Sequence, residues 1–163
     1  MKNPRVHWYQ GLFVRPQHLQ AADRHWSEFE HTSQHWDHPY GYGIHAFSYS
    51  KDALVSGHFR VEELDARLRD GTLIRLESGQ ELEVDLKEAF ETQSDSDSES
   101  TLMIYVGVPK LNLGGANVSQ DSSNGFARFT RTEMTVMDEN GQDSGQPIEF
   151  RRLNLRLIVG GET

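Results

Sequence analysis

The sequence contains no cysteine among its 163 residues. This absence excludes disulfide bonds and thiolate metal sites, and it is typical of proteins from a reducing compartment. No apolar run approaches the roughly 20 residues that a helix needs to span a bilayer, and the first residues lack the apolar segment of a signal peptide. These absences predict a soluble, cytoplasmic protein that does not insert directly into a membrane.

Basic residues are scarce, with 16 Lys and Arg against 25 Asp and Glu and a net charge of -9. This balance argues against nucleic acid as a partner, because neutralising phosphates requires a basic surface. Residues 1–24 hold four basic residues against one acid, Asp23, whereas residues 70–100 hold ten acids against Arg75 and Lys87. Such an asymmetry suits electrostatic steering between protein subunits, although a solvated acidic face explains the second region equally well.

Apolar residues are also few, at 36% of the chain, and the mean hydropathy is -0.67. The length fits one domain, but this composition predicts a modest core and several polar loops. A core of this kind favours cover of the remaining apolar surface by further chain or by other subunits.

The N-terminal region is the most distinctive part of the sequence. Residues 1–16 are expected to form an extended arm that bends at Gly11, since glycine tolerates a positive φ. Pro16 suits the first turn of a helix, where its missing N–H costs nothing. A helix is expected over residues 17–36, because apolar residues recur there at intervals of three and four, and Pro39 should follow its end.

The pattern changes to that of strands after residue 42. We expect strands within residues 42–49, 64–68, 72–76, 102–108, 126–137 and 153–159, and loops at 94–100, 114–125 and 138–147. Asp70-Gly71 predicts a two-residue hairpin turn. Several strands joined by long loops after a single helix indicate a mainly β fold, an antiparallel β-sandwich over residues 17–163.

Four of these strands carry more specific expectations. The apolar composition of 102–108 predicts a central strand, and 42–49 should be buried on both faces. Residues 126–137 should form two short strands, with Phe129, Met134 and Val136 facing inward. The alternation in 153–159 predicts one continuous strand with its leucines on a single face.

The sequence has a cluster of histidines in the expected helix, at positions 25, 31, 35 and 38. His31 and His35 are four residues apart, so both imidazoles lie on one helix face, as a metal site needs. No glutamate follows His31, and a third ligand would have to come from His38 or a distant carboxylate. A polar helix face, with cationic histidine favoured near a helix C-terminus, is the preferred interpretation, and a histidine-dependent metalloenzyme is the weaker one.

No other motif predicts catalysis or a cofactor. Ser56, His58 and Asp52 are close in sequence, but the nucleophile-elbow pattern is absent. The glycine pairs at 114–115 and 160–161 lack the setting of a phosphate-binding loop. The three tryptophans could stack on sugars, but such residues more often anchor a core or an interface. We therefore expect a protein that is not an enzyme and binds no cofactor or metal.

The N-terminal stretch carries a resemblance to a known family. The residues that carry it are Trp8, Gly11, Leu12, Phe13, Val14, Pro16, Gln17, His18, Leu19 and Gln20, with Gln10 departing where an acid is common. Later segments support it in the same order, namely Tyr42-Gly43-Ile44, Asp70-Gly71-Thr72, Val108-Pro109-Lys110-Leu111-Asn112 and Arg152-Leu153-Asn154-Leu155-Arg156-Leu157. This pattern resembles the TssK family of type VI secretion baseplate proteins, also called ImpJ or VasE.

The resemblance implies a structural role. The first domain of this family is similar to the shoulder domain of phage receptor-binding proteins, and its members form homotrimers that dock on the TssF and TssG wedge. They link the baseplate to the membrane complex through a C-terminal domain, which this sequence lacks along with the helical middle. The localisation implied is cytoplasmic, at the inner-membrane-docked baseplate. The alternative is a glycan- or receptor-binding β-sandwich of phage-tail-like origin.

The resemblance also implies a partner-binding segment at the arm and the helix start. The residues expected to bind are Trp8, Gly11, Leu12, Phe13, Pro16, Gln17 and His18. Within this segment we expect the residues before Gly11 to face a partner and those after it to pack nearer to their own domain. Whether residues 94–100 become ordered on binding is left open by the sequence.

Overall fold

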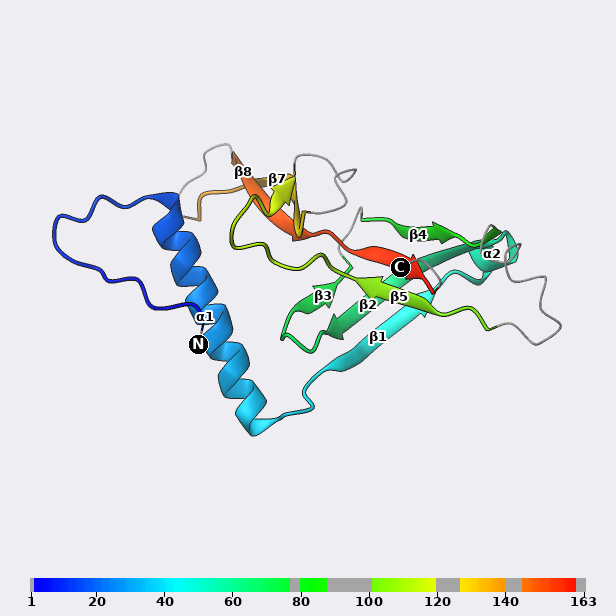
Figure 1. Ribbon diagram of the computed structural model, residues 1–163. Coiled ribbons are helices and arrows are strands. Elements are labelled where there is room, and N and C mark those ends of the chain that lie inside the picture. Colours follow the sequence, from blue (N-terminus) through cyan, green and yellow to red (C-terminus); the bar gives the residue numbers. More distant parts are fainter. Residues whose placement is uncertain (1, 77–79, 88–100, 120–126, 140–144, 161–163) are drawn as a thin grey trace. The chain divides into compact units, whose positions relative to one another are not determined.

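A computed structural model describes residues 2–76, 80–87, 101–119, 127–139 and 145–160 (Figure 1). The elements are α1 (Pro16–Asp37), β1 (Gly43–Tyr49), α2 (Lys51–Val55), β2 (His58–Arg67), β3 (Leu73–Arg75), β4 (Leu82–Asp85), β5 (Ile104–Gly107), β6 (Val118–Ser119), β7 (Phe129–Val136), β8 (Gln146–Leu153) and β9 (Arg156–Val159). The fold is mainly β with antiparallel sheets and one long N-terminal helix, which confirms the predicted class.

The chain divides into two compact units. Unit 1 comprises Met1–Phe47 and Glu63–Leu76, and unit 2 comprises Ser48–Glu62 and Glu77–Thr163. Strand β2 contributes to both: its first half pairs with β4 in unit 2, and its second half pairs with β3 in unit 1.

In unit 1, the arm and helix follow the sequence pattern. Gly11 has a φ of 86°, and the Leu12 N–H donates to the Tyr9 carbonyl at 3.2 Å, so the arm turns where the glycine predicted it. Helix α1 covers the expected span with one further residue at each end, and Pro16 occupies its first turn. The helix ends in a turn in which the Gly41 N–H donates to the His38 carbonyl at 3.0 Å.

The β2–β3 hairpin exists, but its loop has one residue more than predicted. The Leu68 N–H donates to the Thr72 carbonyl at 2.9 Å, which leaves Arg69, Asp70 and Gly71 between the paired residues. Gly71 has a φ of 82°, so the glycine forms the left-handed position of a three-residue loop rather than half of a two-residue turn. The hairpin buries Leu64 and Ile74, the core of unit 1.

Strand β1 differs from the prediction, because it is not buried on both faces. Among the described strands it pairs with β2 alone, at the edge of its sheet, and most of its residues are exposed. Ile44 and Phe47, expected inside, are exposed. An alternating apolar pattern cannot distinguish an edge strand from a central one, because strand order depends on distant residues.

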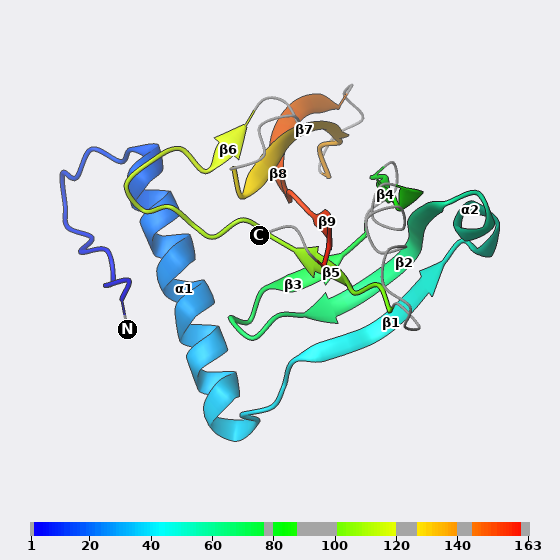
Figure 2. The same cartoon turned by 45° about the vertical axis from the view of Figure 1, so that its right-hand side comes forward.

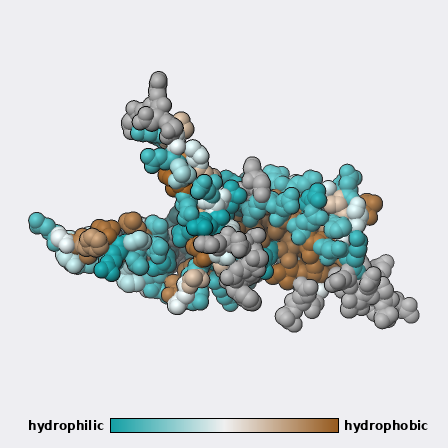
Figure 3. Space-filling model, turned by 90° about the horizontal axis from the view of Figure 1, so that it is seen from above, coloured by the Kyte–Doolittle hydropathy of each residue, from teal (hydrophilic) through white to brown (hydrophobic). Residues whose placement is uncertain are grey.

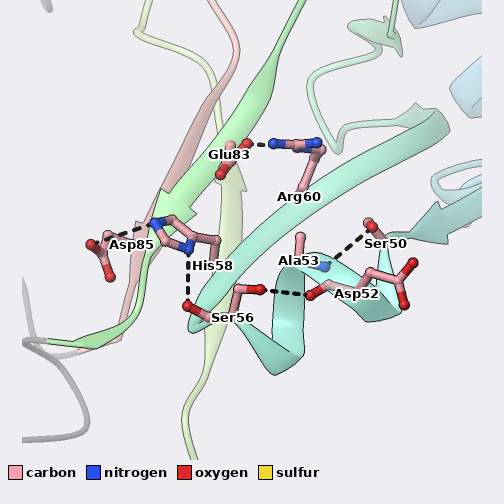
Figure 4. A network of polar contacts seen from close by, with 8 residues as sticks. All are labelled: Ser50, Asp52, Ala53, Ser56, His58, Arg60, Glu83 and Asp85. Atoms are coloured by element: carbon pink, nitrogen blue, oxygen red, sulfur yellow. Dashed lines mark hydrogen bonds and ion pairs between the residues drawn. The ribbon is translucent and has the colours of Figure 1, made fainter.

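Unit 2 begins with the short helix α2 and the paired β2–β4 segment (Figure 4). The Ser50 hydroxyl caps α2 by accepting from the Ala53 N–H at 3.4 Å. Val61 and Leu82 face each other across β2 and β4 and are both buried. On the exposed side of the same pair, the Arg60 guanidinium donates to the Glu83 carboxylate at 2.6 Å.

The remaining strands form two further sheets (Figures 1 and 2). β5 pairs antiparallel with β9, β7 pairs antiparallel with β8, and β6 pairs parallel with β7. In the described part of the chain, β5 has the single partner β9, so the prediction of a central strand at 102–108 is wrong. Short β6 lies within the expected loop 114–125. The loop expected at 138–147 ends earlier, because β8 begins at Gln146.

Two other strand predictions are also wrong. Residues 129–136 form one strand, β7, rather than two, and Met134 and Val136 are exposed rather than inward-facing. The expected strand 153–159 is interrupted at Asn154, whose buried side chain donates to the Ala127 carbonyl at 2.9 Å. A buried amide must find such a partner, and the chain passes from β8 to β9 there. Residues 94–100 lie outside the described part of the chain.

Candidate docking surface of the N-terminal arm

The beginning of the arm is fixed to the side of α1 by Glu28. Its carboxylate accepts hydrogen bonds from the Lys2 N–H at 2.6 Å, the Asn3 N–H at 2.8 Å and the Asn3 side-chain amide at 2.9 Å. The bond from the Lys2 N–H, followed by that from the Asn3 N–H, lowers the pKa of Glu28 below its ordinary value. Glu28 is therefore held as an anion, the form that accepts all three bonds.

A second contact near Glu28 involves His25, which is only 6% exposed. The Arg5 guanidinium donates to its Nε2 at 3.1 Å, because arginine is always a donor. Nδ1 must then carry the ring proton, which it donates to the Asn3 carbonyl at 2.8 Å. The Arg5 guanidinium carbon also lies 5.1 Å from the centre of the Trp26 ring. The first residues of the arm are therefore held on α1 by several contacts.

The other end of the arm is fixed where the helix starts. The Arg15 N–H donates to His18 Nδ1 at 3.1 Å, and the His18 N–H returns a bond to the Arg15 carbonyl at 2.9 Å. The Trp8 ring lies 6.2 Å from the His18 ring. Residues 6–14 thus form a loop whose two ends are both held by α1 (Figure 1).

The arm exposes its apolar side chains. Phe13 is 78% exposed and Trp8 is 50% exposed, and Tyr9 and Val14 are also exposed, whereas Leu12 is half-buried. Figure 3 shows apolar atoms in brown on this segment, at the left of the view. The expectation that residues after Gly11 pack closer to their own domain is wrong for Phe13, whose side chain is 78% exposed.

The other predicted partner-binding residues shape the arm. Gly11 supplies the turn, and Pro16 with Gln17 begins the helix. His18 is half-buried between Arg15 and Trp8. We define the arm surface as Trp8, Tyr9, Phe13, Val14 and Leu19, the exposed apolar residues from the arm to the first helical turns.

The sequence did not predict the residues that hold the arm in place. Glu28 and His25 lie on α1 twenty or more positions from their partners, and a single carboxylate or imidazole on a polar helix carries no signal of such a contact. The capping pattern before Pro16 is likewise atypical, since Arg15 and His18 replace the usual hydroxyl and carboxylate.

The segment around Ser56 was considered for catalysis, and the contacts there are structural (Figure 4). The Ser56 hydroxyl donates to the Asp52 backbone carbonyl at 3.1 Å, and His58 Nδ1 contacts the Ser56 carbonyl rather than its hydroxyl. The carboxylate nearest to His58 is Asp85, at 3.7 Å from Nε2. Serine and histidine are therefore not arranged as a nucleophile and its base.

Comparison with known proteins places the chain in a family. A family model described as bacterial type VI secretion, VC_A0110, EvfL, ImpJ, VasE matches residues 18–163. The chain belongs to this type VI secretion family. The recognition of the TssK (ImpJ/VasE) family from the N-terminal motif is thereby confirmed.

A curated relative is the type VI secretion system baseplate component TssK1 of Pseudomonas aeruginosa, 25% identical over 159 residues. The match covers 96% of this chain but 34% of that protein, so the chain spans about a third of the relative's length.

Solved structures share the fold. A chain of the TssK-TssF-TssG baseplate subcomplex matches all of this chain with a TM-score of 0.84 at 22% identity, covering 53% of that chain. A crystal structure of TssK matches 99% of this chain with a TM-score of 0.77 at 20% identity, covering 35% of that chain. Within the described residues, no helix is both long and apolar enough to cross a membrane.

Proposed function

We propose that this chain is the baseplate-docking region of a TssK-type protein and that it acts by binding rather than by catalysis. The observation that carries the proposal is the family match over residues 18–163, together with a fold shared along the whole chain with a member of the TssK-TssF-TssG subcomplex. The partners proposed are TssF and TssG, and further copies of the same protein in a homotrimer.

The arm surface is the proposed docking element. Its aromatic side chains are exposed, and aromatic residues carry much of the binding energy at protein interfaces, with single truncations costing on the order of 2 kcal/mol or more. Because both ends of the arm are held on α1, less conformational entropy is lost when a partner covers it than for a free tail. Attachment at both ends therefore favours tight docking by a short segment.

The proposed location is the cytoplasmic baseplate. The link to the membrane complex is assigned to other parts of the full-length protein, because this chain matches about a third of the curated relative. The net charge of -9 and the uncovered apolar arm are both consistent with a protein surface as the partner.

The test is co-purification of the full-length protein with TssF and TssG. The double variant Leu12→Asp, Phe13→Asp introduces two charges where an apolar partner surface is expected, so complex recovery should fall at least tenfold. Circular dichroism should remain that of the parent, because Phe13 is 78% exposed and Leu12 is only half-buried.

A matched control is Val55→Asp, since Val55 is an apolar residue that is 90% exposed and lies at the end of α2, away from the arm in sequence. This variant should bind as the parent does. Full recovery of TssF and TssG by the arm double variant would reject the arm as the docking element.

A further inference from the structure

Unit 1 contains a solvent-open hollow that the docking proposal does not use. It lies between the last turns of α1, the turn that follows the helix, and the β2–β3 hairpin. The hollow encloses little space of its own and is open to solvent. Any ligand that fits entirely inside it must therefore be small.

The lining of the hollow has one sign of charge. Arg67 and Arg69 contribute two permanent cations, and His31, His35 and His38 contribute three imidazoles, while no Asp or Glu lines it. Across the described ranges, neither guanidinium forms an ion pair with a carboxylate. A cationic cluster without counter-ions is unusual in a chain of net charge -9.

Both arginines are held in place by neutral groups. The Arg67 Nη2 donates to the Gln34 side-chain carbonyl, and its Nη1 lies against Gly41, where an added Cβ would be 3.7 Å away. The Arg69 guanidinium lies over the Tyr42 ring at 5.1 Å. A positioned guanidinium offers a planar fork of N–H donors that matches the oxygens of a carboxylate or phosphate.

The histidines add donors to the same hollow. His31 Nδ1 is buried without a hydrogen-bond partner and lies against Gly71, so Nε2 is the ring nitrogen left to meet a ligand. The His35 ring is 6.0 Å from the His31 ring, one helical turn later. Nε2 donates to a ligand when it carries a ring proton.

A metal ion is the alternative ligand for a histidine pair, but the positive charge of the neighbouring arginines disfavours it. No group of three metal-ligating side chains exists in the part of the chain that the structure describes. Arg67 and Arg69 would repel a cation at this site. The carbonyl end of α1 contributes only about half a negative charge, which is smaller than the two full positive charges of the arginines.

We propose that this hollow binds a small oxyanion, either a phosphate or a carboxylate group, through Arg67, Arg69 and the His31–His35 pair. The proposal goes beyond baseplate docking and does not depend on it. The same N–H donors would bind either group, and separate titrations with phosphate and acetate distinguish the two.

The experiment titrates the protein with inorganic phosphate, acetate or chloride at constant ionic strength and follows histidine side-chain NMR signals. Phosphate or acetate should give saturable shifts at His31 and His35, and chloride should not. The variant Arg67→Gln, Arg69→Gln should weaken this binding at least tenfold. Arg69→Gln alone provides a safer comparison, because Arg69 is exposed.

Arg75→Gln is the matched control for charge. Arg75 lies on the neighbouring strand β3 and pairs with Asp65 at 2.7 Å, outside the hollow. Replacing Arg75 with glutamine removes one positive charge, as each substitution in the hollow does. It should leave anion binding unchanged. Equal shifts with chloride, or binding insensitive to loss of both arginines, would overturn the proposal. If zinc binds saturably and neither phosphate nor acetate binds, the hollow is a metal site and not an anion site.

Discussion

Two segments of unit 1 contact the same helix, but they differ in where their apolar side chains lie. The arm is attached through polar groups, Glu28 and His25 on α1, and leaves its aromatic side chains exposed. The β2–β3 hairpin buries its apolar residues Leu64 and Ile74 and leaves charged side chains around the turn. The hairpin also contacts α1 through a polar group, the Arg67 guanidinium on Gln34. The difference lies in the apolar side chains, because those of the arm stay available to a partner, whereas Leu64 and Ile74 do not.

The largest expected effect separates these two kinds of apolar residue. Ile74 is 1% exposed, and Ile74→Ala should lower the free energy of unfolding by about 2–5 kcal/mol, because it removes buried contacts and leaves a cavity. Phe13→Ala should change it by less than about 0.5 kcal/mol, as is usual for surface substitutions. Urea denaturation measures both. Equal destabilisation by the two variants would remove the distinction between the arm and the hairpin.

A smaller effect compares the glycines that turn the two segments. Gly11 and Gly71 have nearly the same φ, 86° and 82°, so alanine at either position costs roughly 1–2 kcal/mol in backbone strain. At Gly71 an added Cβ would also overlap the His31 ring, whereas at Gly11 nothing lies within 4 Å. Gly71→Ala should therefore lower the melting temperature by more than Gly11→Ala.

The variant His31→Ala identifies the cause of that difference. Combined with Gly71→Ala it should recover the steric part of the loss and bring the effect close to that of Gly11→Ala. No recovery would mean that the contact between the hairpin loop and α1 does not limit the substitution.

The smallest effect concerns the pH at which the arm is released. The pKa of Glu28 is lowered in the folded state, first by the Lys2 N–H and then by the Asn3 N–H. A lowered pKa means that this attachment stabilises the arm above the unfolded pKa of about 4.5 and is lost as the pH falls through the folded pKa. The protection of the Lys2 and Asn3 amides from hydrogen exchange, measured relative to the intrinsic exchange rate at each pH, should therefore fall in acid.

Glu28→Gln is the control for this titration. A glutamine cannot ionise, so protection of these amides should be lower than in the parent at neutral pH and should lose its acid-dependent step. An unchanged acid step in the variant would assign the transition to another group.

Some of this architecture follows directly from local residues. The three-to-four spacing of apolar residues and the position of Pro16 predicted α1 to within one residue at each end. The N-terminal motif indicated the family, and the match of residues 18–163 to the family model then showed it. Asp70-Gly71 placed the hairpin, because glycine is the residue that adopts a positive φ at low cost.

Other features were not predictable, because they depend on residues far apart in the chain. Periodicity marked 102–108 as apolar, but it could not show that β5 would have β9 as a partner and no second neighbour among the described strands. The alternation of 153–159 concealed the interruption at Asn154, whose amide bonds to the carbonyl of Ala127, 27 residues earlier.

The sequence alone therefore determined the helix, the hairpin, the turn at Gly11 and the family, since each depends on local backbone preference or on a contiguous motif. Only the tertiary structure decided that Glu28 and His25 hold the arm, that Phe13 is exposed, and that Arg67 and Arg69 meet the histidines of α1 in one hollow. The physical reason is that burial, hydrogen-bond partners and local charge are properties of neighbours in space, which residue spacing along the chain does not specify.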